Sequence, residues 1–282
     1  MTQHFTLTVS CPQRPGIIHA VSSFLFSRRC DIAEHQQFDD TGSQAFFLRT
    51  TFACADDIDI TELTEQFATV ASGFGMTFRI DDSSLPRVVV MVSKMGHCLN
   101  DLIFRWRAGT LGGELVAVVS NHETLRPMAE AAGLPFTHIP VTPTTKAEAE
   151  AELLALVDEY QGDLVVLARY MQVLSDEACQ ALQGRAINIH HSFLPGFKGA
   201  KPYHQAYDRG VKLVGATAHY VTPDLDEGPI IEQEVIRIDH SYNATRLATV
   251  GQDAEALALS RAVRWHCENR VLLHGHRTVV FS

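Results

Sequence analysis

The chain has 282 residues, of which 46% are hydrophobic, 20% charged and 8% aromatic. This composition is typical of soluble globular proteins and excludes collagen, coiled coils and intrinsic disorder, while the length allows one large domain or two smaller ones. Asp and Glu number 33 against 23 Lys and Arg, a formal net charge of -10. The chain has no basic field to attract a phosphate backbone or an anionic bilayer, so neither nucleic acid nor a membrane is an expected partner.

The six cysteines are scattered along the chain without CxxC spacing or the density of a disulfide scaffold. We therefore expect free thiols in a reducing cytosol. The first residues, MTQHFTL, lack the cationic and apolar regions of a signal peptide, and the longest apolar runs, such as 88–92, are far shorter than a membrane span. The sequence thus predicts a soluble, cytoplasmic protein.

Residues 1–81 predict a small domain of strands and helices. Alternating residues at 5–10 are typical of a half-buried strand, and a turn rich in Pro and Gly separates them from an apolar-periodic stretch at 17–26. The expected elements in chain order are strand 5–10, helix 17–26, strands 32–38 and 45–52 joined by a turn, helix 59–72 and strand 76–80. This βαββαβ order is that of ferredoxin-like modules. Residues 82–87 form the expected linker.

Residues 88–282 predict a second, larger domain in which apolar runs alternate with helical segments. Such runs are typical of buried parallel strands. The expected strands are 88–92, 115–119, 136–139, 164–167 and 186–189, followed by 215–221 and 230–236 on either side of an acidic loop. The expected helices are 98–106, 123–132 and 146–160. This order predicts an open, mostly parallel, doubly wound α/β domain. It contains no GxGxxG after its first strand and no Walker sequence, which argues against dinucleotide and nucleoside triphosphate sites.

Two polar stretches follow strands of the second domain, where ligands bind in sheets of this kind. The first is NIHHSFLPG at 188–196, in which alternation places Asn188 and His190 on one face, and the second is TPDLDEGP at 222–229. An amide, an imidazole and a carboxylate can perform acyl transfer without a covalent intermediate. The amide and a protonated imidazole donate to the developing oxyanion, while the carboxylate holds the imidazolium and accepts a proton from the nucleophile.

Spacing alone leaves other interpretations of these residues open. His190 and His191 are equally compatible with core or loop histidines, and Asp226 can simply fix a turn before Glu-Gly-Pro. A metal site that adds His204 and His219 to the histidine pair is a further alternative, although nothing resembles HExxH or a cysteine ligand pattern. At this point acyl chemistry is a hypothesis.

The two polar stretches resemble the signature of the formyltetrahydrofolate-dependent formyltransferase fold, through NIHHSFLP at 188–195 and DLDEGP at 224–229. Glycinamide ribonucleotide and methionyl-tRNA formyltransferases share this fold. Within that group, FKGAKPYHQAY at 197–207, GATAHYV at 215–221 and the doubled histidine resemble the formyltetrahydrofolate deformylases. The N-terminal domain, with RPG at 14–16, resembles the ACT domain that precedes the catalytic domain in these deformylases, so the resemblance covers essentially the whole chain.

The resemblance implies hydrolysis of 10-formyltetrahydrofolate to tetrahydrofolate and formate, a reaction of one-carbon metabolism that supplies purine biosynthesis. Water then takes the place of the amine that a transferase binds. The family's catalytic Asn, His and Asp fall on Asn188, His190 and Asp226. Asn188 and His190 would hold the tetrahedral oxyanion, and Asp226 would pair with His190 and accept the water proton. The folate substrate is the only small molecule implied, and neither a metal nor another cofactor is expected.

Folate contacts are also implied by the resemblance. The segment ARYMQVLS at 168–175 aligns with the segment that lines the pterin pocket in the transferases. Met171, Gln172 and Leu174 are therefore the expected folate-binding residues. A Met and a Leu after a strand are, however, often core residues, so a purely structural role is the alternative.

The ACT-like domain implies regulation by an amino acid. In such domains the effector binds near the first strand–helix turn and at a paired interface, so Gly16 and Asp31 are the expected contacts. Methionine and glycine are the effectors that the family suggests, and a homo-oligomer is expected. The structural alternative is that Pro15 and Gly16 only begin the helix and that the domain serves solely to oligomerise.

Departures from the transferase pattern distinguish the related activities. Glycinamide ribonucleotide formyltransferases have a loop rich in Gly, Ser and Asn that cradles the substrate phosphate, whereas SKMGHC at 93–98 has one glycine and bulky neighbours. This difference favours water over an amine as the acceptor. Lys198 and Lys201 are expected to close over the site or to hold the folate glutamate tail. A non-catalytic amino-acid sensor whose larger domain only binds folate is the other alternative, and the intact catalytic trio argues against it.

Overall fold

The computed structural model describes most of the chain, namely residues 2–54, 58–196 and 202–282. The chain divides into two compact units. The first extends to Ser84 and also includes 269–272 and 279–282, and the second consists of 85–268 and 273–278. Nothing in the sequence indicated that C-terminal segments would belong to the first unit.

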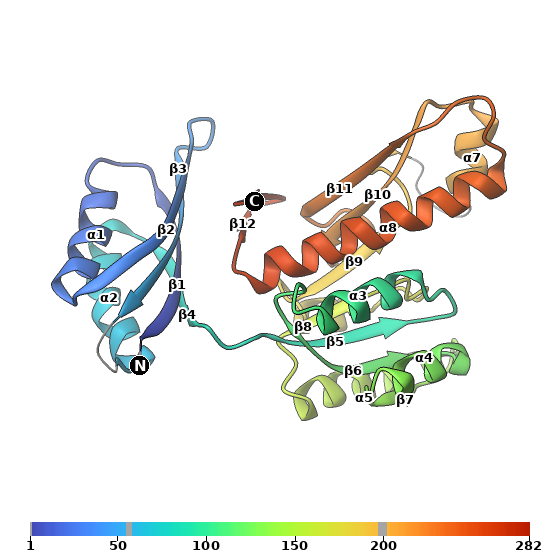
Figure 1. The fold of residues 1–282 in the computed structure, drawn as a ribbon, viewed down its shortest axis with the longest axis horizontal. Coiled ribbons are helices and arrows are strands. Elements are labelled where there is room, and N and C mark those ends of the chain that lie inside the picture. Colours follow the sequence, from blue (N-terminus) through green and yellow to red (C-terminus); the bar gives the residue numbers. More distant parts are fainter. Residues whose placement is uncertain (1, 55–57, 197–201) are drawn as a thin grey trace. The chain divides into compact units, whose positions relative to one another are not determined.

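The first unit contains a four-stranded antiparallel sheet with two helices on one face (Figure 1). Its elements are β1 (Gln3–Pro12), α1 (Ile17–Ser27), β2 (Cys30–Asp40), β3 (Ala45–Cys54), α2 (Ile60–Phe74) and β4 (Thr77–Asp82). The strand order is β2-β3-β1-β4, and each neighbouring pair is antiparallel. The predicted ferredoxin-like βαββαβ arrangement is confirmed.

Alternation along β1 builds the core of this unit. Phe5, Leu7 and Val9 are buried, while the residues between them are half exposed. They belong to one hydrophobic cluster with Leu25 of α1 and Phe67 of α2. Burial of each such side chain contributes about 1.5–3 kcal/mol. The alternation of apolar residues along β1 therefore gives the sheet one apolar face, on which both helices pack.

The central strand β3 is buried on its other face too. Phe47 packs there in a second cluster with Leu272 and Phe281 from the C-terminal segments. Arg49 follows on the same face and forms a 2.6 Å ion pair with Glu34. The apolar contacts of Phe47 explain physically why the C-terminal segments belong to the first unit.

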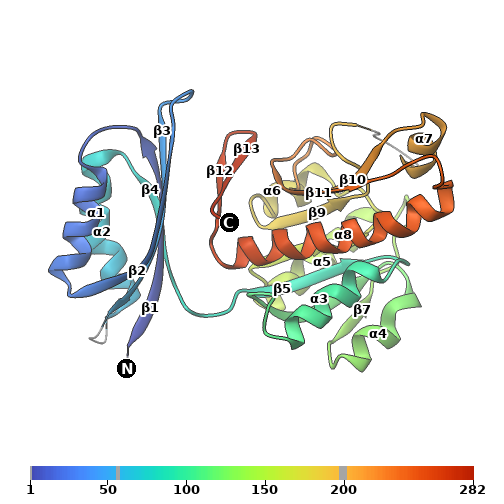
Figure 2. The same ribbon diagram turned by 45° about the horizontal axis from the view of Figure 1, so that its top comes forward.

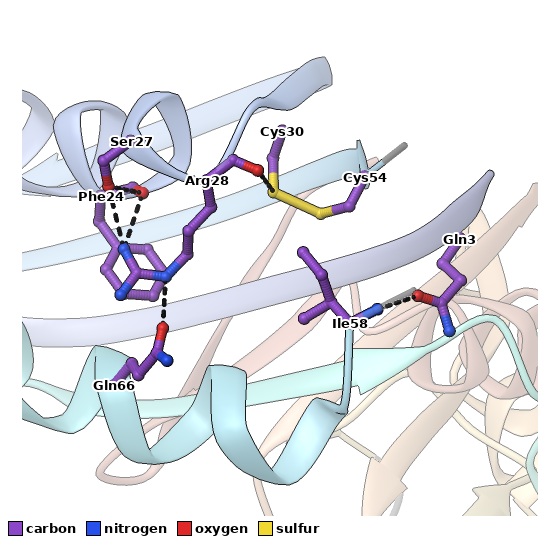
Figure 3. Close-up of a disulfide and its surroundings, with 8 residues drawn as sticks. All are labelled: Gln3, Phe24, Ser27, Arg28, Cys30, Cys54, Ile58 and Gln66. Atoms are coloured by element: carbon purple, nitrogen blue, oxygen red, sulfur yellow. Dashed lines mark hydrogen bonds between the residues drawn. A yellow bond between two sulfur atoms is a disulfide. The ribbon is translucent and has the colours of Figure 1, made fainter. Parts of the chain in front are cut away.

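A disulfide joins Cys30 and Cys54 in the first unit (Figure 3). The two residues lie directly opposite each other in the antiparallel pair of β2 and β3, with their Cα atoms 4.4 Å apart. The expectation of free thiols is therefore wrong for this pair, because strand register, which no spacing motif encodes, brings the sulfur atoms together. The remaining cysteines are free and buried: Cys11, Cys98, Cys179 and Cys267.

The second unit is built on a seven-stranded sheet with the order β11-β10-β9-β8-β5-β6-β7. Strands β5 to β9 are parallel to their neighbours within that group, and β10 runs antiparallel to both β9 and β11. The strands are β5 (Arg87–Val92), β6 (Glu114–Ser120), β7 (Phe136–His138), β8 (Leu164–Leu167), β9 (Ala186–His190), β10 (Leu213–Tyr220) and β11 (Ile230–Arg237). This confirms the predicted open, mostly parallel sheet.

Helices cover both faces of this sheet (Figure 2). They are α3 (His97–Arg107), η1 (Glu123–Leu125), α4 (Arg126–Ala131), α5 (Lys146–Glu159), α6 (Asp176–Ala181), α7 (Pro202–Asp208) and α8 (Ala244–Cys267). Apolar residues of α5 and α6 form one hydrophobic cluster with β5 and β8, and α8 contacts α3 and the strands β9 to β11. The doubly wound prediction is confirmed.

The C-terminal part of the chain forms a two-stranded hairpin of β12 (Val271–His274) and β13 (Arg277–Val280). Across the described residues, no helix has both the length and the apolar character needed to span a bilayer.

Candidate active site

A cavity of about 590 Å³ lies where β8 and β9 end. Its walls include the segment 169–174 after β8, the histidines at the end of β9, and the loop after β10, and it also touches α7 and α8. A volume of this size suits a small-molecule ligand. The position, beyond the carboxyl ends of parallel strands, is the one that the sequence analysis expected.

The predicted catalytic residues all line this cavity: Asn188, His190 and Asp226. Asn188 and His190 alternate along β9, which directs both side chains to the same face of the sheet. Asp226 comes from the loop after β10 and has a left-handed backbone, with φ of 58°. Asp tolerates this conformation better than most residues.

Gly228 allows the loop that carries Asp226 to return against the end of β10. A Cβ atom at position 228 would collide with the carbonyl oxygen of Tyr220. The Tyr220 N–H also donates to the carbonyl oxygen of Pro229 at 2.9 Å. This close approach of the two backbone segments therefore requires glycine at position 228. The same contacts hold the loop that carries Asp226 against the end of β10.

His190 and Asp226 form the central pair of the site. The Nδ1 atom of His190 lies 3.1 Å from Oδ1 of Asp226, and the two side chains are only 7% and 13% exposed. The hydrogen bond from His190 lowers the pKa of the Asp226 carboxyl below its ordinary value, against the opposing effect of burial. Asp226 is therefore ionised at neutral pH, and its carboxylate accepts a hydrogen bond from the Nδ1–H of His190.

The second ring nitrogen of His190 has no partner in the described part of the protein. Nε2 is buried and has no hydrogen-bond partner among the described residues, and the ring lines the cavity. Because Asp226 pairs with Nδ1, Nε2 is the ring nitrogen that is left without a hydrogen bond. A buried polar atom without a partner is costly unless a ligand satisfies it.

Asn188 is oriented by His219, a residue that the sequence analysis considered only as a metal ligand. The two residues pair across β9 and β10, and Nδ2 of Asn188 lies 3.3 Å from Nε2 of His219. His219 Nδ1 is 2.9 Å from the carbonyl oxygen of Tyr220, so Nδ1 carries the proton and Nε2 accepts. Burial lowers the pKa of His219, which keeps the ring neutral. Asn188 thus donates one amide hydrogen to His219 and retains the other for a ligand.

The predicted folate contacts also lie at the cavity. Met171, Gln172 and Leu174 all line it. Met171 is 56% exposed, whereas Leu174 is buried in the hydrophobic cluster that α5 and α6 form with β5 and β8. Ser93 holds this segment in place, because its hydroxyl accepts from the Met171 N–H at 3.0 Å and donates to the Asn121 side chain at 2.7 Å. Binding of folate by these residues remains a prediction.

A buried carboxylate, Glu255 of α8, lies at the edge of the same cavity. It is 1% exposed and accepts a 2.7 Å hydrogen bond from the Tyr203 hydroxyl. Its other oxygen lies 2.8 Å from Nε2 of His97 and 3.3 Å from Nε of Arg169. Favourable contacts with His97 and Arg169 outweigh burial and lower the pKa of Glu255. No sequence motif indicates this cluster, because its members come from separate elements.

The described residues contain one group with metal-ligand spacing, made of His97, Cys98 and Glu255, whose ligand atoms lie within 4.8 Å of one another. The guanidinium of Arg169 already neutralises Glu255 there and would repel a cation. The four histidines considered as ligands in the sequence analysis do not form such a group in the described part of the chain.

The two expected effector residues, Gly16 and Asp31, lie near opposite ends of α1 within one chain. Gly16 caps the start of α1 with φ of 95°, whereas Asp31 lies in β2, after the end of the same helix. The eleven residues of α1 separate these ends by about 16 Å. Effector binding by Gly16 and Asp31 remains a prediction. Lys198 and Lys201, expected near the folate, lie outside the described residues.

The sequence and the fold of this chain resemble those of known proteins. A family model described as formyl transferase matches residues 86–263. The formyltetrahydrofolate deformylase of Corynebacterium sp. (strain P-1) is 52% identical over 97% of this chain and 96% of its own length. That of Bacillus subtilis is 48% identical over 98% of this chain and 93% of its own.

Solved structures give the same result. The formyltetrahydrofolate deformylase of Burkholderia mallei superposes with a TM-score of 0.94 at 53% identity, covering 99% of this chain and 100% of that one. The glycinamide ribonucleotide transformylase 1 of Symbiobacterium toebii has a TM-score of 0.66 at 30% identity, covering 70% of this chain and 95% of that one. The chain therefore belongs to the formyltetrahydrofolate deformylase family, and its larger unit has the formyl transferase fold.

Proposed function

We propose that this protein hydrolyses 10-formyltetrahydrofolate to tetrahydrofolate and formate by direct attack of water. The observation that carries the proposal is the convergence of Asn188, His190 and Asp226 on one cavity, in a chain whose relatives are deformylases. Each of these groups has a separate task in the reaction, and none forms a covalent bond to the substrate.

The reaction begins when the water oxygen bonds to the formyl carbon and the carbonyl electron pair moves to its oxygen. The remaining Asn188 amide hydrogen and the Nε2–H of protonated His190 donate to this oxyanion. Asp226 stabilises the imidazolium through Nδ1 and accepts the water proton. The carbon–N10 bond then breaks, N10 takes up a proton relayed through His190 or solvent, and formate leaves. Water is consumed and one proton is released to solvent as formate ionises.

The electrostatics of the site support these tasks. Because the hydrogen bond from His190 lowers the pKa of Asp226, the carboxylate is charged when an imidazolium has to be stabilised. Because burial lowers the pKa of His219, that ring stays an acceptor and orients the Asn188 amide. Removal of one such oxyanion donor typically lowers the rate by about 100- to 1,000-fold.

The cavity walls support a folate as the substrate. The pocket combines apolar side chains such as Met171, Leu174 and Leu225 with the proposed polar catalytic groups, a mixture that is common in small-molecule sites. Gln172 offers an amide to the pterin edge. We include Met171, Gln172 and Leu174 in the proposal as folate contacts.

We further propose that residues 1–81 form an ACT-like regulatory domain, joined by 82–87 to a catalytic domain at 88–282. The βαββαβ order of the first unit supports this assignment. Methionine or glycine would bind through Gly16 and Asp31 in a homo-oligomer, where two copies can supply the separated residues. Calorimetric titration with each amino acid tests this part, and wild-type affinity in a Gly16→Ala, Asp31→Ala double variant would refute it.

The principal experiment is to incubate the purified protein with 10-formyltetrahydrofolate alone and to measure tetrahydrofolate and formate. Equal amounts of both products are expected, and they should vanish in an Asn188→Ala, His190→Ala double variant. Turnover only after an amine is added would show a transferase. Tight folate binding without any turnover would show a sensor.

A further inference from the structure

The cavity contains a histidine, His191, that the proposed reaction leaves without a task. It follows directly after β9 and lines the cavity with the catalytic residues. Its ring stacks on that of His190, with centroids 5.2 Å apart and an interplanar angle of 29°. The Tyr203 ring is 6.4 Å from it. No hydrogen bond to its ring nitrogens is made by any residue that the structure describes, so both are available to a molecule in the cavity.

The surroundings of His191 keep its ring uncharged. Burial, followed by the positive charges of Arg169 and His190, lowers the pKa of His191 to about 4, although Glu255 and Asp226 oppose this effect. A neutral imidazole has one N–H donor and one nitrogen lone pair. His191 can therefore accept a hydrogen bond from water, and its weak basicity makes it a group that orients water rather than one that keeps the proton.

A buried network fixes the side of the cavity next to His191. Tyr203 donates to Glu255 at 2.7 Å, and the tyrosine ring lies over Gly251, where a Cβ atom would collide with it. Arg169 pairs with the same carboxylate at 3.3 Å. Gly251 and Glu255 are one helical turn apart on α8. The helix thus supplies both the space for Tyr203 and the anion that holds Tyr203 and Arg169.

We infer that His191 is the water-binding residue of the site, with one ring nitrogen accepting a hydrogen bond from the water that attacks the formyl carbon. This inference rests on the proposed hydrolysis and goes beyond it by naming the group that selects water as the acceptor. The second hydrogen of that water goes to Asp226, as in the proposed reaction. Tyr203, whose ring lies beside that of His191 and whose hydroxyl is held by Glu255, acts as a positioning residue.

The test separates attack by water from attack by another nucleophile. Hydroxylamine attacks the same formyl carbon through its nitrogen and releases tetrahydrofolate and formohydroxamate, without need for a bound water. The His191→Phe variant keeps a flat ring against His190 but lacks both nitrogens. His191→Gln restores an acceptor, and His240→Phe makes the same change at an exposed histidine as the matched control.

With 10-formyltetrahydrofolate and hydroxylamine present together, formate and formohydroxamate are measured for each variant. We expect His191→Phe to lower the rate of formate release about 10- to 100-fold, as removal of an orienting contact does. The rate of hydroxamate formation should fall less than threefold, so the product ratio shifts at least about tenfold. His191→Gln should recover part of the hydrolysis, and His240→Phe should match the wild type.

Each alternative outcome has a definite meaning. Equal loss of both products in His191→Phe, or unchanged formate release, would overturn the inference. If hydroxylamine does not react in the wild type, the kinetic constants decide: a fall in kcat with unchanged KM, partly restored in His191→Gln, supports it, and a rise in KM alone overturns it. Absence of formate from the wild-type protein would instead refute the proposed hydrolysis itself.

Discussion

Replacement of Asp226 by Asn is the sharpest perturbation that the structure offers. The amide keeps the shape of the side chain but removes the charge 3.1 Å from His190 Nδ1. Two unit charges 4 Å apart attract by about 4 kcal/mol at the effective dielectric constant of a partly buried protein site. The imidazolium in the transition state loses this stabilisation, and the amide cannot accept the water proton. Since about 1.4 kcal/mol corresponds to a factor of ten, kcat should fall about 1,000-fold.

The assay is formate release from 10-formyltetrahydrofolate under saturating conditions, measured for Asp226→Asn beside Asp224→Asn. Asp224 lies in the same loop but is exposed, so the matched change there should leave kcat within about twofold of the wild type, as expected for an exposed charge. KM should change little in either variant, because the lost interaction forms mainly in the transition state. A kcat for Asp226→Asn within tenfold of the wild type would refute the assigned role.

Three further changes test the surroundings of the trio. In Gly251→Ala, the new Cβ collides with Tyr203, so the free energy of unfolding should fall by about 1–3 kcal/mol; a gain, as Gly→Ala in an open helix gives, would contradict this packing. In Gly228→Ala, the collision with the Tyr220 carbonyl displaces the acidic loop that carries Asp226. The value of kcat should therefore fall at least about 100-fold while circular dichroism shows an intact fold. A wild-type kcat in this variant would contradict the proposed dependence of the reaction on the loop position. The pKa of His191, lowered from 6.5 to about 4, means that the unfolded chain binds a proton before the folded one as pH falls. The contribution of His191 to the free energy of unfolding should therefore be constant above pH 6.5 and should decrease by about 3 kcal/mol between pH 6.5 and pH 4. The decrease should be smaller in His191→Gln, and an equal decrease in both proteins, measured by urea denaturation, would exclude His191 as its cause.

The sequence predicted most of the fold because its signals are local. Apolar runs of β-branched residues defined the parallel strands, and alternation in the first unit defined the face of β1 that meets the helices. The long helix α8 was missed, because the prediction relied on apolar runs flanked by turn signals and extended no helix beyond residue 160. The C-terminal hairpin was missed for a different reason, because its contacts with Phe47 are remote in sequence.

The proposed catalytic trio could be predicted from the sequence because Asn188 and His190 share a face of one strand, Asp226 lies in an acidic turn, and all three match the motifs of the family that the chain resembles. Only the tertiary structure showed that His219 orients the amide, that Cys30 faces Cys54, and that Glu255 gathers its partners. His97 and Glu255, for example, are 158 residues apart in the chain and 2.8 Å apart in space. Periodicity along the chain determines which face of an element is buried, whereas hydrogen bonds and ion pairs depend on distances that exist only after the elements have packed.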